Sequence, residues 1–346
     1  MSPRLLQPLV AGVAALVLLS NLGGPALWDE DEPKNAACSA AMLDGGDWVV
    51  PTFNGRLRVE KPALVNWVQM AGFALAGRNE TGARLGSACL SIGTAVLTAR
   101  FAAAALGAEA GLIAGLAMAS CVWTAVGGRS ATPDAPLLLC TTLGLASALA
   151  ARRARAAGRP ASLPTIACGA ALGAATLAKG PVGICLPLAA FLLHAAWDAA
   201  DGDAGEFVSR LRHRVHDLRL PVLLGTAAVV ALPWYLAVTL RTRGAWLEGF
   251  LLVHNVGRFA APMEGHAGST LLYYPVVLAV GFFPWSIVLA AVVAHALEVS
   301  RAGHVSAEEH RRRDGVRLMT CWLVAWVAAL DRKSTRLNSS HANISY

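Results

Sequence analysis

Charged residues are scarce in this chain: aspartate, glutamate, lysine and arginine make up 15% of its 346 residues, whereas hydrophobic residues make up 55%. A soluble domain carries more charge and fewer apolar residues, so the composition excludes that class. The net charge of +7 does not indicate nucleic acid as a partner. The arginines are concentrated in short segments between apolar runs, which is typical of a protein oriented in a membrane.

The cysteines lack the spacing that disulfide frameworks and zinc sites require. Six of the seven lie in apolar runs, and only Cys38 lies in a polar segment. The chain also shows no internal repeat and no stretch with the composition of a soluble domain. The sequence therefore predicts neither a disulfide framework nor a structural zinc site.

The sequence contains many long apolar runs, and they predict an all-α, polytopic membrane protein. We interpret the first run, residues 5–23, as a transmembrane helix, because no convincing cleavage site for a signal peptide follows it. Abundant glycine and alanine in the runs favour close packing of helices in lipid. The other runs lie at residues 62–77, 84–105, 109–127, 134–151, 163–178, 181–197, 220–240, 271–296 and 317–330.

Arginine content predicts the orientation of these runs. Arginines gather in segments 152–159, 198–219 and 297–317, which are therefore expected in the cytoplasm. With the N-terminus also inside, segments 24–61, 128–133, 179–180 and 241–270 face outward.

Three of the apolar runs affect this predicted orientation. The predicted orientation requires that run 62–77 does not cross the membrane. This run is shorter than the ~20 residues of a membrane span, so we expect it to dip in or to lie along the interface. Runs 163–178 and 181–197 form either two spans or one re-entrant unit, and the orientation is preserved in both cases.

The outward segment 24–61 is acidic and predicts an amphipathic helix on the membrane surface. Asp31 or Glu32 is placed to cap the helix, Pro33 suits its first position, and Gly45-Gly46 ends it. Its apolar face consists of Ala36, Ala40 and Leu43.

Three motifs in this segment carry a resemblance to a known family. They are WDEDEPKNAACSAAML at residues 28–43, GDWVVP at 46–51 and NGRLRVEKPALVNW at 54–67. In sequence and spacing they resemble the first extracytoplasmic loop of the GT-C membrane glycosyltransferases. The greatest similarity is to family 39, which includes the aminoarabinose-lipid A transferases and the protein O-mannosyltransferases. Lys34-Asn35 stands where the family usually has Arg-Tyr, and Lys61-Pro62-Ala63 stands where it has Lys-Pro-Pro.

The resemblance implies a GT-C-like helix bundle over residues 1–330 and a transferase active site on the extracytoplasmic face of a bacterial inner membrane. The implied reaction moves a sugar from a polyprenyl phosphate to a lipid A, glycan or protein acceptor. The phosphate is already a competent leaving group, so the enzyme needs a carboxylate on the acceptor side and cations at the phosphate.

The catalytic carboxylates implied by the resemblance are Asp31, Glu32 and Glu60. Asp31 matches the first residue of the family's Asp-Glu pair and is the leading candidate for the acceptor-side base. The alternative for Asp31 and Glu32 is a capping role at the helix start. The alternative for Glu60 is an ion pair with Lys61.

The candidates for binding the donor phosphate are Lys61, Lys179 and Arg258, with Asp134 as a partner of Lys179 or of the substrate. The alternatives are a snorkelling anchor for Lys179 and a helix-dipole partner for Asp134. His254 together with Glu60 or Asp31 is a possible ligand set for a divalent metal.

Two other classes of protein stay open from the sequence: a catalytically inactive family member, suggested by Lys34 and Asn35, and a multi-pass transporter. A transporter is expected to place charges at the membrane midplane and to show repeated halves, and neither is visible here. The polar tail 331–346 resembles translated vector sequence joined to a shortened gene, and we exclude it from the expected fold.

Overall fold

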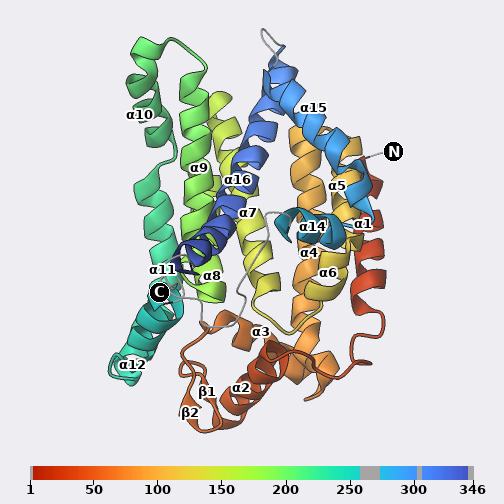
Figure 1. Ribbon diagram of the computed structural model, residues 1–346, viewed down its shortest axis with the longest axis vertical. Helices are drawn as coiled ribbons and strands as arrows, with labels where there is room; N and C mark the ends of the chain where they lie inside the picture. Colours follow the sequence, from red (N-terminus) through yellow and green to blue (C-terminus); the bar gives the residue numbers. More distant parts are fainter. Residues whose placement is uncertain (1–2, 258–272, 302–305, 342–346) are drawn as a thin grey trace.

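The computed structural model describes residues 3–257, 273–301 and 306–341, and it is almost entirely helical. The long helices run side by side along the long axis of the molecule (Figure 1). This arrangement confirms the predicted all-α polytopic fold. The long helices are α1 (Pro3–Leu19), α4 (Glu80–Leu106), α5 (Ala108–Ser120), α7 (Asp134–Ala156), α8 (Ser162–Lys179), α9 (Val182–Ala200), α11 (Leu220–Arg241) and α16 (Ala307–His341).

Several of these helices are suited to cross a membrane. Within the described residues, four segments are long and apolar enough: Glu80–Leu106, Asp134–Ala156, Val182–Ala200 and Phe207–Arg241. The runs 163–178 and 181–197 form two separate neighbouring helices, α8 and α9 (Figure 1).

The two ends of the bundle differ in charge. The lower end in Figure 1 carries α2 (Asp31–Gly45), α3 (Leu64–Ala76) and α12 (Ala245–Glu248), and we call it the loop end. The upper end carries α10 (Phe207–Asp217) and the arginine-rich connections, and we call it the arginine end. The predicted outward and cytoplasmic segments that the structure describes thus separate to opposite ends.

Helix α3 explains how this separation is maintained. It has 13 residues, a length of ~20 Å at the α-helical rise, and α4 begins at the loop end directly after it (Figure 1). The run 62–77 therefore does not cross the bundle, as the arginine pattern predicted.

The apolar run at residues 271–296 does not form one continuous helix in the part that the structure describes. It is divided into α14 (Tyr273–Gly281), a 3₁₀ turn at Trp285–Val288 and α15 (Leu289–Arg301). Pro284 lies at the break and cannot donate a helical hydrogen bond. Instead, the carbonyl of Phe283 accepts a bond from the Val122 amide at 3.0 Å, at the start of α6 (Val122–Gly127). Two further short elements are a 3₁₀ turn at Ala204–Glu206 and a π-helix at Gly249–Gly257.

Small residues bring the helices close together in the bundle. A Cβ atom on Gly169 of α8 would lie 2.4 Å from the Leu223 carbonyl oxygen of α11, and one on Gly173 would lie 2.6 Å from that of Ala227. These two glycines are four residues apart, so they share one face of α8. The contact depends on this small-residue face, as expected for helices that pack in lipid.

Helix α2 starts at Asp31, two residues before Pro33, which the sequence suggested as its first residue. Glu30 occupies the N-cap position without a side-chain cap bond, so the prediction that Asp31 or Glu32 is the cap is wrong. Pro33 is accordingly the third helical residue. The predicted end is confirmed, since Gly46 has a left-handed φ of 63° and its amide returns to the Leu43 carbonyl.

The predicted apolar face of α2 packs against other helices of the protein. Ala36 is buried against Phe73 of α3 and Ala83 of α4, and Ala40 and Leu43 pack beside it. The neighbouring face of α2 buries polar residues, among them Asn35 and Ser39. Helix α2 is therefore a structural part of the loop end.

A two-residue hairpin follows α2, and the sequence analysis did not predict it. Strands β1 (Thr52–Phe53) and β2 (Arg56–Leu57) are antiparallel, with Thr52 opposite Leu57 and Phe53 opposite Arg56. Asn54 and Gly55 connect them with φ values of 50° and 72°. The Asn-Gly pair is the sequence signal for this turn.

Tryptophan side chains fix the segment around the hairpin by donating to its backbone. The indole nitrogen of Trp234 bonds to the Val49 carbonyl at 3.0 Å, and that of Trp246 bonds to the Arg58 carbonyl at 2.9 Å. Both rings are buried and lie edge to face, with centroids 4.8 Å apart. They hold the loop end in place through packing and hydrogen bonds together.

A buried ion pair ties α2 to the bundle. The Glu32 side chain is 2% exposed and Arg84 of α4 is 5% exposed, with Nη2 of Arg84 2.6 Å from Oε2 of Glu32. Burial alone raises the pKa of Glu32, but bonds from Arg84 and from the backbone amides of Ala131 and Trp28 bring that pKa below its ordinary value. Arg84 also donates to the carbonyls of Leu22, Pro25 and Ala26.

We expect Glu32→Gln to destabilise the folded protein by about 3–5 kcal/mol, because it leaves the buried Arg84 guanidinium without its counter-charge. Thermal unfolding in detergent at neutral pH measures this loss. Because the folded pKa of Glu32 is lowered, the stabilisation is present at neutral pH and is lost as the pH falls through that pKa. The difference between wild type and variant should therefore shrink in acid. Equal unfolding temperatures at neutral pH would show that the pair contributes nothing.

The separation of the two ends also predicts opposite accessibility across the membrane. Ala41 on α2 and Ala157 after α7 are exposed. We expect an impermeant maleimide to label Ala41→Cys in intact cells and to label Ala157→Cys only after the membrane is opened. The background should lack the native cysteines, since Cys89 and Cys185 are exposed. Labelling of both positions in intact cells would contradict this orientation.

Candidate active site

The first candidate carboxylate, Asp31, lies at the start of α2 and faces a lysine. Its side chain is 50% exposed, and its Oδ2 lies 3.6 Å from Nζ of Lys61, which is 13% exposed. Asp31 is the first residue of the helix, where the helix dipole favours a negative charge. An accessible carboxylate and a largely enclosed ammonium group therefore lie together at the loop end.

A second pair of opposite charges comes from two other helices. Asp134 is the first residue of α7 and Lys179 the last residue of α8, and Nζ of Lys179 lies 2.5 Å from Oδ1 of Asp134. Lys61 is close enough to Asp134 for their charges to interact. Residues from the segment before α3, from α7 and from α8 thus come together, although they are far apart in the sequence.

The connection that precedes Asp134 is held by α2 and α3. The Ala131 amide donates to Oε1 of Glu32 at 2.7 Å, and its carbonyl accepts bonds from Asn35 at 2.9 Å and Gln69 at 3.1 Å. All three side chains are buried. The position of Asp134 therefore depends on the same buried groups that anchor α2.

Glu60 lies beside a buried arginine. Nε of Arg58 lies 3.1 Å from Oε2 of Glu60, whose side chain is 41% exposed. Arg58 also donates to the Lys34 carbonyl at 3.0 Å and to Oδ1 of Asn35 at 2.7 Å. Lys34 and Asn35, two of the positions at which the sequence departs from the family pattern, are thus bound by this arginine. Glu60 pairs with Arg58, whereas the sequence analysis named Lys61 as its alternative partner.

The structure separates the roles of adjacent carboxylates. Asp31 is accessible, whereas Glu32 is enclosed by Arg84 and two backbone amides. Sequence reasoning did not select Arg84 or Arg58. For Arg84 a signal was present, since an arginine at the start of an apolar run requires a partner.

Among the residues that the structure describes, one group of three His, Cys, Asp or Glu side chains is close enough to share an ion: His194, Asp198 and Asp314, at the arginine end. The pairing of His254 with Glu60 or Asp31 around a metal stays a prediction. His254 belongs to the π-helix at Gly249–Gly257, and Glu60 pairs with Arg58. The predicted phosphate ligand Arg258 lies outside the described residues.

This arrangement suits recognition of a phosphate next to an accepting group. Lys61 and Lys179 offer ammonium groups whose present partners, Asp31 and Asp134, are both exposed. Exposed ion pairs contribute little to stability, so an anionic ligand can replace the carboxylate at small cost. Asp31 would then be available to accept a proton or a hydrogen bond.

Comparison with known sequences points to a single class of protein. Residues 60–201 match the dolichyl-phosphate-mannose-protein mannosyltransferase family. A curated relative from Pseudomonas aeruginosa, named undecaprenyl phosphate-alpha-4-amino-4-deoxy-L-arabinose arabinosyl transferase, is 34% identical over 307 residues. That match covers 85% of this chain and 50% of the relative, so the chain spans about half the length of the curated relatives it matches.

Comparison with solved structures agrees with the sequence matches. ArnT from Cupriavidus metallidurans, solved with undecaprenyl phosphate bound, superposes with a TM-score of 0.73 at 25% identity, covering 92% of this chain and 53% of ArnT. The Pmt1-Pmt2 protein O-mannosyltransferase complex of Saccharomyces cerevisiae shares the fold, with a TM-score of 0.52 at 20% identity, covering 68% of this chain and 34% of that one. By its sequence and its fold together, the chain is a family 39-like GT-C membrane protein.

Proposed function

We propose that this protein takes part in transferring a sugar from a polyprenyl phosphate to an acceptor at the loop end of the bundle. The observation that carries the proposal is the pairing of accessible Asp31 with Lys61, beside the Lys179–Asp134 pair. An acceptor-side carboxylate and phosphate-side cations are the groups that this reaction needs.

In this proposal Lys61 and Lys179 bind the phosphate of the donor lipid as it leaves the sugar. Each contact is a charge-assisted hydrogen bond to a phosphate oxygen. The sequence-based candidate Arg258 belongs to the same proposed group. Asp134 holds Lys179 in place until the phosphate arrives, and it contacts the substrate afterwards.

Asp31 acts on the acceptor in the proposed reaction. Its carboxylate orients the nucleophilic oxygen and takes its proton where the nucleophile is a hydroxyl group. That oxygen forms a bond to the anomeric carbon, and the bond from that carbon to the phosphate oxygen breaks. Arg58 positions Glu60 at the wall of the site. We assign Glu32 a structural role, because its carboxylate is fully engaged by Arg84 and backbone amides.

The names of the relatives support undecaprenyl-phosphate-linked 4-amino-4-deoxy-arabinose as the donor to test first. The acceptor is a lipid A, a glycan or a protein, as the family resemblance implies. We further propose that the loop end faces the outside of a bacterial inner membrane. The arginine distribution between the two ends supports that orientation.

We expect Asp31→Asn to lower sugar transfer by ~10²-fold or more, which is the scale of general-base catalysis. The change keeps the size of the side chain and removes only its charge and basicity. Because the chain spans half the length of its relatives, the assay should use a chimera in which residues 1–330 replace the matching half of the P. aeruginosa relative. Transfer of radiolabelled sugar from its lipid carrier in membranes is the readout.

Glu30→Gln is the matched control for Asp31→Asn. Glu30 precedes Asp31 directly and pairs with Lys34 at the surface, where its side chain is 81% exposed. The control should keep activity near that of the parent chimera. Normal transfer by Asp31→Asn, or an equal loss in both variants, would remove Asp31 from the proposed mechanism.

We expect Lys61→Gln to weaken binding of undecaprenyl phosphate by at least ~10-fold, because a hydrogen bond from a charged donor is lost. Lys34→Gln is the control, since Lys34 is a lysine of the same segment that pairs with Glu30. Binding is measured with labelled lipid in detergent, so the test does not require turnover. If Lys61→Gln binds as tightly as Lys34→Gln, the donor phosphate lies elsewhere.

A further inference from the structure

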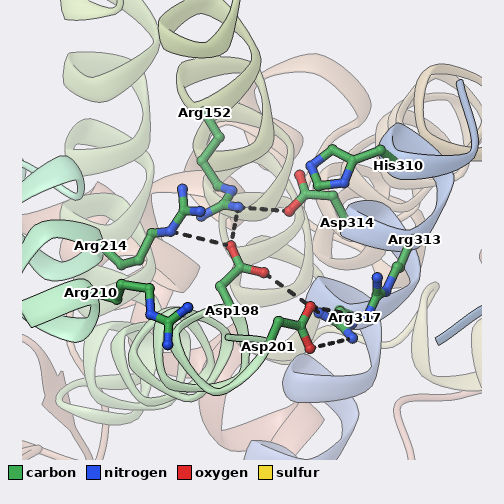
Figure 2. Close-up of a pocket in the computed structure, with 9 residues that line it drawn as sticks. All are labelled: Arg152, Asp198, Asp201, Arg210, Arg214, His310, Arg313, Asp314 and Arg317. Carbon is green, nitrogen blue, oxygen red and sulfur yellow. Dashed lines mark hydrogen bonds and ion pairs between the residues drawn. The ribbon is translucent and has the colours of Figure 1, made fainter. Parts of the chain in front are cut away.

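A polar pocket of about 240 Å³ lies at the arginine end, opposite the candidate active site. Side chains from α7, α9, α10 and α16 converge on it (Figure 2). The proposed transfer reaction uses none of them. The lining residues are Arg152, Asp198, Asp201, Arg210, Arg214, His310, Arg313, Asp314 and Arg317.

The pocket carries an excess of positive charge. Five arginines and three aspartates line it, so two positive charges remain when His310 is neutral. The pocket thus has the charge to accommodate a phosphate group, which carries one or two negative charges near neutral pH.

The ion pairs inside the pocket show which arginines carry the excess positive charge. Arg152 binds Asp198 and Asp314, each at 2.7 Å, and Arg313 binds Asp201 at 3.0 Å. The aspartates are therefore already neutralised by arginines of α7 and α16. An incoming anion would meet the arginines of α10, which lie at the opposite wall (Figure 2).

Two arginines of α10 are only weakly engaged. Arg214 reaches Asp198 at 4.0 Å, through Nε. Arg210 donates to the Asp203 carbonyl, and it makes no ion pair with a carboxylate among residues 3–257, 273–301 and 306–341. The Nε atoms of Arg210, Arg152 and Arg313 are buried, and no hydrogen-bond partner for them is found in the described part of the chain. Buried N–H groups of this kind are costly unless a ligand or water satisfies them.

The same pocket could be read as a metal site, because His194, Asp198 and Asp314 offer ligand atoms within 4.8 Å of one another. The guanidinium of Arg152 lies between the two carboxylates, at 2.7 Å from each. A divalent cation there would have to displace this positive charge or lie against it. The charge distribution therefore favours an anion over a cation.

Helix α10 places the pocket near a lipid surface. It packs against α9, and on its surface Val208 is 75% exposed. Arg212 and His213 are also exposed. Helices with apolar and basic residues of this kind lie at the interface of membranes that contain anionic lipids. Arg210 and Arg214 are four residues apart, so they share the face that lines the pocket.

We propose that the pocket between α7, α9, α10 and α16 binds a phosphate group, supplied by an anionic phospholipid headgroup or by free phosphate. Arg210 and Arg214 donate to its oxygens, with Arg152 and Arg313 behind them. Planar guanidinium groups bind phosphate through paired hydrogen bonds, which suits this set of side chains.

The test compares two double variants of the chain in phosphatidylcholine nanodiscs. R210Q/R214Q removes the two charges that face the pocket, whereas R212Q/R219Q removes two charges from exposed positions of the same segment. Inorganic phosphate is titrated at constant ionic strength against chloride, and the unfolding temperature is followed. We expect a saturable rise in wild type and in R212Q/R219Q, with affinity at least ~10-fold weaker in R210Q/R214Q.

Two results would overturn the proposal: equal effects of phosphate and chloride on the wild type, or equal losses in the two double variants. The second result would mean that the general positive field of α10 attracts the anion. R210K/R214K keeps the charge without the planar groups and should bind with intermediate affinity. The unfolding temperature without phosphate checks that each variant is folded, and binding by R210Q/R214Q at wild-type affinity would also refute the site.

The source of the phosphate is distinguished by repeating the titration in phosphatidylglycerol nanodiscs. If a headgroup occupies the pocket, added phosphate no longer raises the unfolding temperature. Native mass spectrometry should then detect phosphatidylglycerol bound to wild type and not to R210Q/R214Q. If the pocket takes free phosphate, the rise persists in both lipids. Failure of this site would leave Asp31 and Lys61 unaffected, because they lie at the opposite end.

Discussion

The loop end of this protein depends on the buried ion pair between Glu32 and Arg84. Two charges removed from water are costly unless geometry and hydrogen bonds compensate. Here the Glu32 carboxylate accepts hydrogen bonds from two backbone amides as well as from the guanidinium. The Arg84 guanidinium also donates to three backbone carbonyls. The pair thus connects the end of α1, the start of α2 and the connection before α7. Those three segments carry or position Asp31 and Asp134.

The broad architecture was predictable because hydrophobic length and arginine position act over whole segments. The apolar runs from 5 to 240 follow the order of α1, α3–α9 and α11, although run 109–127 is divided into α5 and α6. The short run 62–77 does not cross the bundle, as the arginine pattern required. The break at Pro284 was missed, although proline was the visible signal. The hairpin at Asn54-Gly55 was also missed, because its strands have only two residues each.

Side-chain partners were less predictable than segments. From the sequence, Glu32 was a possible catalytic carboxylate, and nothing local distinguished it from Asp31. The difference arises from Arg84, which lies 52 residues further along the chain. Trp234 of α11 is likewise buried and bonded to the Val49 carbonyl, 185 residues away in the chain. Such contacts depend on tertiary packing, which composition and spacing do not determine.

Adjacent residues 31 and 32 show how one helix start can serve both stability and ligand exchange. Breaking the enclosed Glu32–Arg84 pair leaves a buried charge, a cost of about 3–5 kcal/mol. The Asp31–Lys61 pair has a carboxylate that is 50% exposed, so it is held less firmly, and in the proposed site an incoming phosphate takes the lysine from this carboxylate. The rigid pair fixes the backbone from which the exchangeable pair projects. In the proposed site, the backbone keeps its geometry while the ion pairs of Asp31 and Asp134 give way to the substrate.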